Sequence, residues 1–540
     1  MLHRYIFVVG GVMSGVGKGV TTASIGKILQ SRGVHVTAIK IDPYVNVDAG
    51  TMNPVEHGEV FVTDDGDETD QDMGNYERFL DTDLTSINYM TTGRVYQTVI
   101  QKERNLEYKG KCVEVVPHIP LEVIRRIKDA AVQAKADVTM VEVGGTVGEY
   151  QNILFLEAAR MMHLEDPEHV LFVLVSYLPV PKHLGEMKTK PTQYATRSLN
   201  SAGIHPDFIV CRGEQFMDKP RREKLSVFCN VKPEDVITAP DVPTIYDIPA
   251  LFESQGFSKA ILKKLGLRSK RGDLRAWKRM ASVQTTAKRT VKIGVVGKYF
   301  STGDYTLSDS YISVIEALKA AAWGNGAKIQ LEWINSEEFE QNPARLRRLS
   351  RYDGVLVPGG FGTRGIEGII ATIRYVREKK IPYFGLCYGM QLACIEFARH
   401  VLGKKAAHTV EVDPKTPDPV IHVSPLQLKN IRENRYGGTM RLGAYDCELR
   451  NGTLAHRSYK TNVVSERHRH RYEFNNDYAQ AMQKKGLVIS GVNPASGLVE
   501  IVELKGHPFF VGVQFHPEFR SRPLRPHPLF KAFIASALKK

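Results

Sequence analysis

The residues with the clearest chemistry lie in the second half of the chain, around Cys387. This cysteine stands in the sequence "GLCYG", which follows an apolar stretch and precedes the helical pattern "MQLACIEFARHV". Glycines on either side of a nucleophile allow a sharp strand-to-helix turn, and the N-terminus of the following helix favours the reactive thiolate. The same five residues are also compatible with a buried structural cysteine, so the decision rests on partner residues.

Such partners occur near the C-terminus, in the sequence "QFHPEF". His516 can serve as the base for Cys387, and Glu518 can orient the imidazole. The glycine-rich turn "PGGFG", which begins at Pro358, offers backbone N–H groups for an oxyanion hole, and the N–H of Tyr388 would join them. Together these parts predict nucleophilic catalysis through a cysteine.

A different chemistry is indicated near the N-terminus by the sequence "GGVMSGVGKGVTT". A strand, a glycine-rich turn, a lysine and a helix in succession are typical of a phosphate-binding loop. The match to G-x-x-x-x-G-K-[ST] fails twice, because Gly11 comes one residue early and Gly19 replaces the hydroxyl residue that would bind magnesium. We still expect Lys18 to contact phosphate, with Thr21 or Thr22 available to help.

Charged residues at the ends of predicted strands complete this second site. Lys40 and Asp42 end the stretch "VTAIKID", and Glu142 ends "ADVTMVEV". Carboxylates at the C-terminal ends of parallel strands, beside a phosphate loop, are usual holders of Mg²⁺. We therefore expect Asp72 and Glu142 to hold Mg²⁺, although the acidic run around Asp72, "DDGDETDQD", is also compatible with a solvated loop.

The elements that must position these residues alternate between strand-like and helix-like segments, which predicts mainly parallel sheets covered by helices. In the first half we expect strands at 5–9, 34–41, 138–143, 170–176 and 207–212, and helices at 22–31, 121–134 and 152–162. The pattern restarts with a strand at Val291, followed by helices at 311–322 and 366–378 and strands from Tyr352 and Ile381. The fold class is thus α/β with two such domains, 1–270 and 291–540, joined by a basic linker at 271–290.

Composition limits the alternatives. A chain of 540 residues is too long for one core. Its six cysteines form no C-x-x-C pair, and no apolar run is long enough to span a bilayer, so we expect a cytoplasmic protein without membrane partners. The net charge of +14 is densest between Lys263 and Lys292. Few aromatic residues interleave there, which favours a solvated linker over a nucleic-acid surface.

The motifs of the second half, "PGGFG", "GLCYGMQ" and "FHPEF", resemble those of class I glutamine amidotransferase domains. The resemblance implies that Cys387 is the nucleophile, His516 the base and Glu518 its partner in releasing ammonia from glutamine. It further implies that glutamine is bound by Gly360, Tyr388, Gly389, Met390, Gln391, Glu411 and Arg471. Glu411 and Arg471 also suit the ammonium and carboxylate ends of an amino acid.

The first half adds "GGVMSGVGKG", "KIDPYVNVDAGTMNP", "HGEVFVTDDGDETDQDMGNYERF", "VEVGGTVGE", "KTKPTQ" and "FCNV" in order. With the glutaminase motifs, these strings resemble the CTP synthase family along nearly the whole chain. The resemblance implies a ligase in which ATP, with Mg²⁺ on Asp72 and Glu142, phosphorylates the 4-oxygen of UTP while Lys18 and Lys40 neutralise charge. Ammonia then displaces the phosphate to give CTP. GTP is implied as an allosteric activator, CTP as a product inhibitor and a homotetramer as the assembly.

The same resemblance assigns nucleotide contacts. For ATP it implies Gly15, Val16, Gly17, Lys18, Gly19, Val20, Asp72, Pro240, Asp241 and Val242. For UTP and CTP it implies Ser14, Glu149, Tyr150, Gln151, Lys188, Thr189, Lys190, Pro191, Thr192, Gln193 and Lys224. Several lysines close together suit a triphosphate, which needs more than one cation.

Two other functions remain open at this stage. One is an ATP-dependent amidoligase that acts on a carboxylate, against which the "KTKPTQ" and "GTMNP" strings argue. The other is a non-enzymatic ATPase that binds nucleic acid or forms filaments, which the positive charge and the unusual glycine loop would suit. The complete set of Cys387, His516 and Glu518 argues against the second, because a binding module needs no activated thiol.

Overall fold

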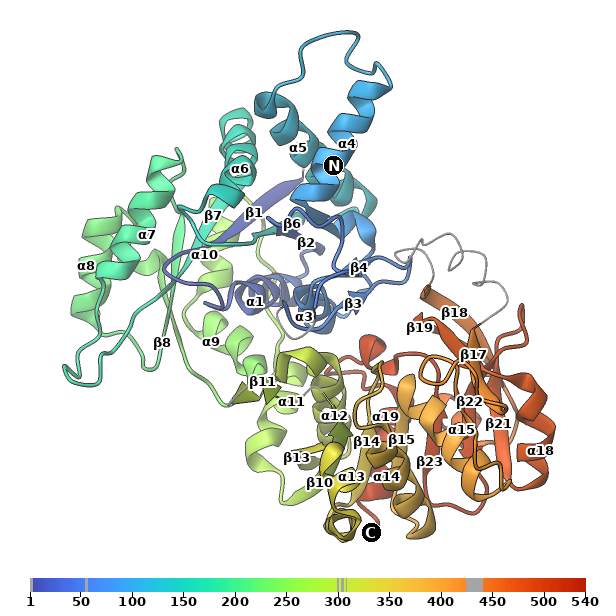
Figure 1. Ribbon diagram of the computed structural model, residues 1–540. Coiled ribbons are helices and arrows are strands. Elements are labelled where there is room, and N and C mark those ends of the chain that lie inside the picture. Colours follow the sequence, from blue (N-terminus) through green and yellow to red (C-terminus); the bar gives the residue numbers. More distant parts are fainter. Residues whose placement is uncertain (1–2, 54–56, 299–300, 303–304, 307, 424–439) are drawn as a thin grey trace. The chain divides into compact units, whose positions relative to one another are not determined.

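Contacts in the computed structural model group the chain into two compact units (Figure 1). The first contains residues 1–49 and 72–281, and the second contains residues 50–71 and 282–540. The structure describes residues 3–53, 57–298, 301–302, 305–306, 308–423 and 440–540. Within this part of the chain, no helix is both long enough and apolar enough to cross a membrane.

The first unit is built on a seven-stranded parallel sheet of order β5-β2-β6-β1-β7-β8-β9. Its central strands are almost entirely buried runs of branched and aromatic residues, as expected of a parallel sheet covered on both faces. The strands are β1 (Arg4–Gly10), β2 (Val36–Asp42), β5 (Tyr89–Thr91), β6 (Val138–Val143), β7 (Val170–Tyr177), β8 (Phe208–Gly213) and β9 (Val236–Pro240).

Helices cover both faces of this sheet. Phe7, Val141 and Phe172 pack on one face with α4 (Thr92–Arg104), α5 (Val115–Gln133), α6 (Ile153–Glu165) and α7 (Lys190–Ser201). Helix α1 (Lys18–Ser31) contacts α9 (Ile248–Ser254) and α10 (Phe257–Lys264). The remaining helices are α3 (Gln71–Leu80), α8 (Lys219–Cys229) and α11 (Arg275–Thr286).

The second unit contains a nine-stranded sheet of order β13-β10-β14-β15-β23-β22-β21-β18-β19. Neighbours from β13 to β23 are parallel, and those from β23 to β19 are antiparallel. The strands are β10 (Arg289–Gly297), β13 (Ala327–Asn335), β14 (Gly354–Val357), β15 (Tyr383–Leu386), β18 (Arg441–Leu449), β19 (Val463–His470), β21 (Leu487–Val492), β22 (Val499–Leu504) and β23 (Phe510–Val513).

Two hydrophobic clusters cover the second sheet. One joins it to α13 (Glu337–Gln341), α14 (Ile366–Glu378), α15 (Tyr388–His400) and α18 (Ala479–Lys484), and the other to α12 (Ile312–Gly324), α17 (Leu454–Tyr459) and α19 (Pro528–Ala537). Short strands pair separately as β11 (Ser301–Thr302) with β12 (Tyr305–Thr306), β3 (Phe61–Val62) with β4 (Glu68–Thr69), and β16 (His408–Thr409), β17 (Pro419–Val423) and β20 (Tyr472–Phe474) together.

The expected fold class, two α/β domains with mainly parallel sheets, is confirmed. By contacts the first unit extends to residue 281, and residues 50–71 belong to the second unit, although they interrupt the first in sequence. The reason is that the acidic run has partners in the second unit, where Asp64 pairs with Arg467 and Glu68 with Arg469. The acidic run is therefore not a solvated loop.

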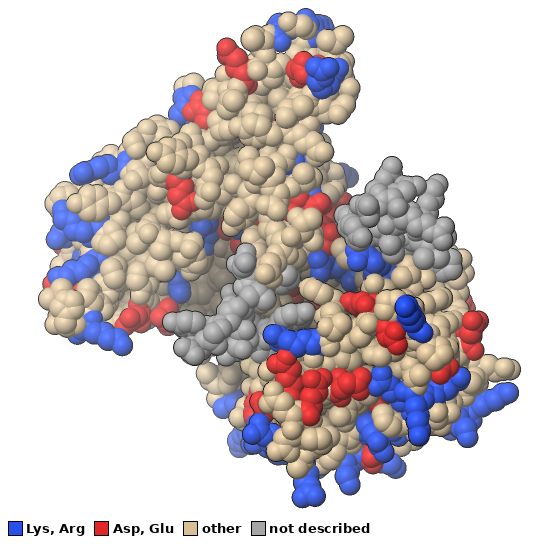
Figure 2. All heavy atoms as spheres, in the orientation of Figure 1, with Lys and Arg blue, Asp and Glu red and all other residues tan. Residues whose placement is uncertain are grey.

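The stretch 271–290, expected to be a solvated linker, contains helix α11 instead. Leu274, Trp277 and Met280 recur at helical spacing among the cations and are buried on the first unit. The Trp277 indole N–H donates to the carbonyl of Tyr246 at 2.7 Å, and its ring lies 5.2 Å from that of Phe79. Figure 2 shows basic and acidic side chains interspersed on the visible face.

Removing Trp277 should destabilise the first unit. Trp277→Ala would delete a ring that is 2% exposed, and large-to-small changes of this kind cost about 3–5 kcal/mol of unfolding free energy. Calorimetry should show a lowered transition for the variant, whereas Lys278→Ala, which trims an exposed side chain of the same helix, should leave it unchanged. Equal transitions for the two variants would contradict the packing role of α11.

Candidate active sites

The glycine-rich loop joins β1 to α1 at the C-terminal edge of the first sheet. Gly17 is the N-cap of α1 and has φ 89°, a left-handed conformation that favours glycine. Lys18, the first residue of the helix, is 9% exposed, and its Nζ donates to the carbonyl of Gly145 at 2.9 Å. Burial lowers the pKa of Lys18, against the effect of Glu142.

Gly19 is explained by a close approach of Asp72. A Cβ added at Gly19 would lie 2.0 Å from Oδ1 and 2.6 Å from Cγ of Asp72. A serine or threonine after Lys18 would therefore displace the carboxylate. Glycine replaces the usual hydroxyl residue at position 19 because Asp72 of α3 occupies the space that its side chain would need.

Lys40 links the carboxylates of this site. Its Nζ lies 2.5 Å from Oδ2 of Asp72 and 3.0 Å from Oε1 of Glu142, and all three groups come from different elements, β2, α3 and β6. The hydroxyl of Tyr76 donates to the other oxygen of Glu142, and Asn75 donates to Asp72 at 3.2 Å.

These contacts set the protonation of the carboxylates. Burial raises the pKa of Glu142. Burial also acts to raise the pKa of Asp72, but the charge and hydrogen bond of Lys40 outweigh it, so that this pKa is lowered. Asp72 is therefore held as a carboxylate beside a cation. Asp42, 3.8 Å from the Lys40 ammonium, has its pKa raised by burial.

The donor set of this cluster fits a divalent cation such as Mg²⁺. Asp72 and Glu142 present oxygen ligands, which Mg²⁺ prefers, and both already contact one cationic group, the ammonium of Lys40. That a single positive charge contacts both carboxylates shows that they converge on one place.

The other nucleotide candidates follow the C-terminal ends of β1 and β9 in the first unit. Ser14 and Gly15 are exposed in the loop, Val16 is buried, and Val20 lies in α1. Pro240 ends β9, and Asp241 and Val242 follow it.

The pyrimidine candidates lie after β6 and β7 and on α8. Tyr150 is 92% exposed, and the Gln151 amide donates to Glu149 at 2.8 Å. In the segment after β7, Lys188, Lys190, Pro191 and Gln193 are exposed or half-buried, Thr189 and Thr192 are buried, and Lys224 is exposed on α8. The hydroxyl of Thr192 is hydrogen-bonded to that of Ser176.

Arg212 was not among the expected residues. It lies in β8, and its Nε is 3.5 Å from where a Cβ at Gly17 would be. It donates to the carbonyl of Ala239 at 3.1 Å and pairs with Asp241 at the same distance. Its position at the end of a predicted strand could have indicated a role in the site. Arg212 adds a cation beside the glycine loop.

Cys387 occupies the predicted elbow in the second unit. It is the N-cap of α15, directly after β15, with φ 47° and ψ −96°, and it is 5% exposed. Its glycine neighbours are required by close packing, since a Cβ at Gly389 would lie 2.4 Å from the carbonyl oxygen of Val357. Gln514 donates to the sulfur at 3.6 Å.

His516 and Glu518 are paired as the sequence predicts. Nδ1 of His516 lies 2.8 Å from Oε1 of Glu518. Burial acts to lower the pKa of His516, but the charges of Glu518 and Cys387 outweigh it and raise the pKa to about 10. The cationic form of His516 is therefore favoured, and a cation at this place suits a cysteine nucleophile.

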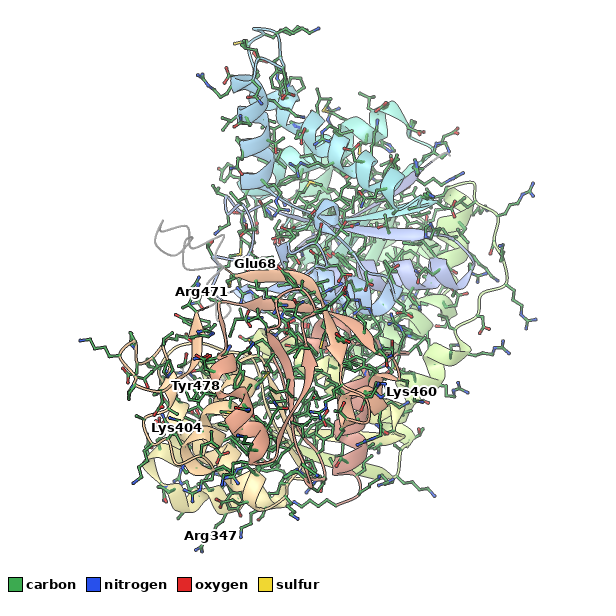
Figure 3. All side chains as sticks on the ribbon, turned by 90° about the vertical axis from the view of Figure 1, so that its right-hand side faces the viewer. Glu68, Arg347, Lys404, Lys460, Arg471 and Tyr478 are labelled. Carbon is green, nitrogen blue, oxygen red and sulfur yellow. The ribbon has the colours of Figure 1, made fainter. Side chains whose placement is uncertain are left out.

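These residues open into a cavity of about 390 Å³. Of the residues expected to bind glutamine, Gly360, Gln391, Glu411 and Arg471 line it. Arg471 is labelled in Figure 3. Among the described residues, Tyr388, Gly389 and Met390 do not line the cavity. Met390 is fully buried and packs beside Gly512. The first turn of α15 can still present the backbone N–H of Tyr388, because such groups lack partners within a helix.

Lys298 is a further residue that the sequence did not single out. It is 6% exposed, and its Nζ donates to the carbonyls of Gly362 at 2.6 Å and Phe361 at 3.2 Å. It lies 4.7 Å over the ring of Tyr388, and burial lowers its pKa to about 8. Glu411 accepts from the N–H of Gly362 at 2.9 Å, so both charges shape the turn after β14. In the sequence, the only indication of a role for Lys298 is its position directly after a predicted strand.

Comparisons with known proteins give one consistent result. A family model described as CTP synthase N-terminus matches residues 4–267, and one described as glutamine amidotransferase class-I matches residues 306–536. A CTP synthase of Pyrococcus abyssi is 50% identical over 538 residues, covering 99% of this chain and 98% of the relative. A CTP synthase of Bacillus licheniformis is 48% identical over 540 residues, covering 100% and 99%.

Among solved structures, the chain is similar to the glutaminase domain of Trypanosoma brucei CTPS with bound acivicin. The two are 37% identical, with a TM-score of 0.43, and the match covers 46% of this chain and 94% of that domain.

The ion pair of Glu518 with His516 should control the reactivity of Cys387. Glu518→Gln removes a charge that raises the pKa of His516, so the imidazolium beside Cys387 is less strongly stabilised. We expect alkylation of Cys387 by iodoacetamide to slow by about tenfold, which corresponds to about 1.4 kcal/mol of lost interaction. Mass spectrometry of the peptides provides an internal control, because exposed Cys112 should react as before. An unchanged rate at Cys387 would exclude this electrostatic coupling.

Proposed function

This chain belongs to the CTP synthase family, and on that premise we propose that its two sites convert UTP to CTP with nitrogen taken from glutamine. The observation that supports this most directly is the pairing of two chemistries in one chain. One unit carries the cysteine, histidine and glutamate of a glutaminase, and the other carries a phosphate loop with two lysines and two carboxylates.

In the glutaminase reaction, the sulfur of Cys387 attacks the side-chain amide carbon of glutamine. The backbone N–H groups of Gly360 and Tyr388 stabilise the developing oxyanion. The imidazolium of His516 donates its proton to the leaving nitrogen, so that ammonia departs as the thioester forms. His516 then takes a proton from the water that hydrolyses the thioester, so that glutamate leaves and the free Cys387 side chain is restored beside the imidazolium. Glu411 and Arg471 bind the ammonium and carboxylate ends of the substrate.

In the synthetase reaction, the terminal phosphoryl group of ATP passes to the 4-oxygen of UTP, and ammonia then attacks C4 and displaces phosphate. Such phosphoryl transfer depends mainly on position and charge. Lys18 and Lys40 supply positive charge, and the helix N-terminus behind Gly17 points backbone N–H groups at the phosphates. Mg²⁺ on Asp72 and Glu142 would, when bound, neutralise charge on the ATP phosphates.

The remaining contacts and partners are also proposals. Gly15–Val20 and Pro240–Val242 bind ATP, while Ser14, Glu149–Gln151, Lys188–Gln193 and Lys224 bind the pyrimidine nucleotide. GTP activates the glutaminase, CTP inhibits by occupying the UTP site, and the enzyme is a cytoplasmic homotetramer. Ligands that prefer the tetramer will shift the assembly by mass action.

The two chemistries should separate by mutation. Cys387→Ala should abolish CTP synthesis from glutamine but retain synthesis from ammonium, because ammonia bypasses the thioester. Lys18→Ala should abolish both, while basal glutamine hydrolysis persists. The measurement is the absorbance change on conversion of UTP to CTP with ATP and Mg²⁺, with Cys112→Ala and Lys259→Ala as controls at exposed positions. Loss of both syntheses in Cys387→Ala would contradict the assignment.

Restoring the standard phosphate-loop hydroxyl should be harmful. In Gly19→Ser the new Cβ would displace the Asp72 carboxylate from its contacts with Lys40 and Asn75. Misplacement of about 1 Å typically costs on the order of 100-fold in rate, and we expect ammonium-dependent synthesis to fall accordingly.

Gly19→Ala serves as the comparison, because it introduces the Cβ without the hydroxyl and should be equally impaired. A Gly19→Ser enzyme as active as the unmodified one would show that Asp72 does not need its observed position.

A further inference from the structure

The acidic run of the first half forms a small hairpin that belongs to the second unit. Strands β3 and β4 pair antiparallel, and the turn between them is closed by the N–H of Gly66 bonding to the carbonyl of Thr63 at 3.1 Å. We call residues 61–69 the acidic hairpin. Its chain follows Lys40 and Asp42 of the phosphate site and leads, three residues after its end, to Asp72.

The hairpin docks by a close backbone approach to β18. The N–H of Ala444 donates to the carbonyl of Asp64 at 2.9 Å. A Cβ at Gly443 would lie 2.8 Å from that carbonyl oxygen, and one at Gly66 would lie 3.1 Å from the carbonyl oxygen of Leu442. Glycine on both sides of the contact therefore fixes how closely the hairpin approaches.

The carboxylate of Asp64 reaches the segment of the catalytic histidine from two directions. One oxygen accepts from Nε of Arg467, and the other lies 3.0 Å from Arg520. The carbonyl of Arg467, a fully buried residue, accepts from the N–H of His516 at 2.8 Å. Arg520 ends the short helix Pro517–Arg520, which follows His516 directly.

Aromatic contacts add a second connection. The ring of Phe61 meets that of Phe519 edge-on at 5.0 Å, and Phe519 stacks on the imidazole of His516 at 5.2 Å with an interplanar angle of 19°. Phe61 and Phe519 are 1% and 3% exposed. The hairpin is also anchored by Glu68, labelled in Figure 3, which pairs with Arg469 of β19 at 2.7 Å.

We propose that the acidic hairpin positions His516, with Phe61 acting through Phe519 and Asp64 through Arg467 and Arg520. Neither residue lines the described part of the glutamine cavity, so both are positioning residues rather than binding residues. The inference rests on the proposed role of His516 as the glutaminase base. It makes glutamine hydrolysis dependent on residues that the sequence places within the phosphate-binding half.

The hairpin could instead be only a structural support for the second unit. That role predicts lower stability without a specific loss of chemistry. A positioning role predicts a fall in kcat for glutamine with KM retained, because His516 acts after substrate is bound. The two contacts converge on one histidine, so their effects should also be non-additive.

The test compares full-length Asp64→Asn, Phe61→Leu and the double variant with the unmodified enzyme. Asp64→Asn keeps the size of the side chain, and Glu448→Gln, at an exposed carboxylate of β18, is the matched control. We expect each single variant to lose about tenfold in kcat for glutamine hydrolysis, and the double variant to lose less than the product of the two. Asp64→Glu, which retains the charge, should recover part of the loss. Alkylation of Cys387 at pH 7 should slow in parallel with kcat.

Ammonium-dependent CTP synthesis should remain within about twofold of the unmodified enzyme, which shows that the phosphate site is intact. Glutamine kcat within about twofold of the control in both single variants, with only the melting temperature lowered, would overturn the positioning role. An unmodified enzyme that makes CTP from ammonium but hydrolyses no glutamine would instead overturn the proposed glutaminase, and this inference with it.

Discussion

The ammonium of Lys40 is the interaction on which the phosphate site of the first unit depends. It joins β2 to α3 through Asp72 and to β6 through Glu142, at the edge where the parallel strands end. Without it, the buried carboxylate of Glu142 and the half-buried carboxylate of Asp72 would lose the cation that contacts both. Removing one partner of a buried ion pair typically costs about 3–5 kcal/mol, so the charges that suit phosphoryl transfer also hold these elements together.

The second unit depends on backbone geometry in a comparable way. Cys387 adopts an unusual conformation for a residue other than glycine, and the tight contacts of Gly385 and Gly389 leave the chain little freedom around it. Strained backbone of this kind persists only where the surroundings determine it. Here the buried strands on either side of β15 provide those surroundings, together with Lys298, which lies over the ring of Tyr388.

Much of this could be predicted from local patterns. The glycine loop, the elbow and the "FHPEF" sequence each place their chemistry within a few residues, and buried parallel strands are evident from their continuous apolar character. Features that depend on distant packing were missed. Nothing near Gly19 indicates that Asp72 lies against it, and nothing in "DDGDETDQD" indicates that Arg467 and Arg469 are its partners. The buried face of α11 was obscured because Trp277 and its apolar neighbours are surrounded by lysine and arginine.

The excursion of residues 50–71 into the second unit has a consequence for the way such a chain can be divided. A cut after residue 281 would leave both α/β sheets whole, but the acidic hairpin would remain attached to the wrong fragment. A fragment beginning at residue 282 would contain Cys387, His516 and Glu518, but it would lack Asp64 and Phe61, which contact Arg467, Arg520 and Phe519. The boundary in sequence and the grouping by contacts do not coincide, so a fragment designed from sequence alone would omit part of the second unit.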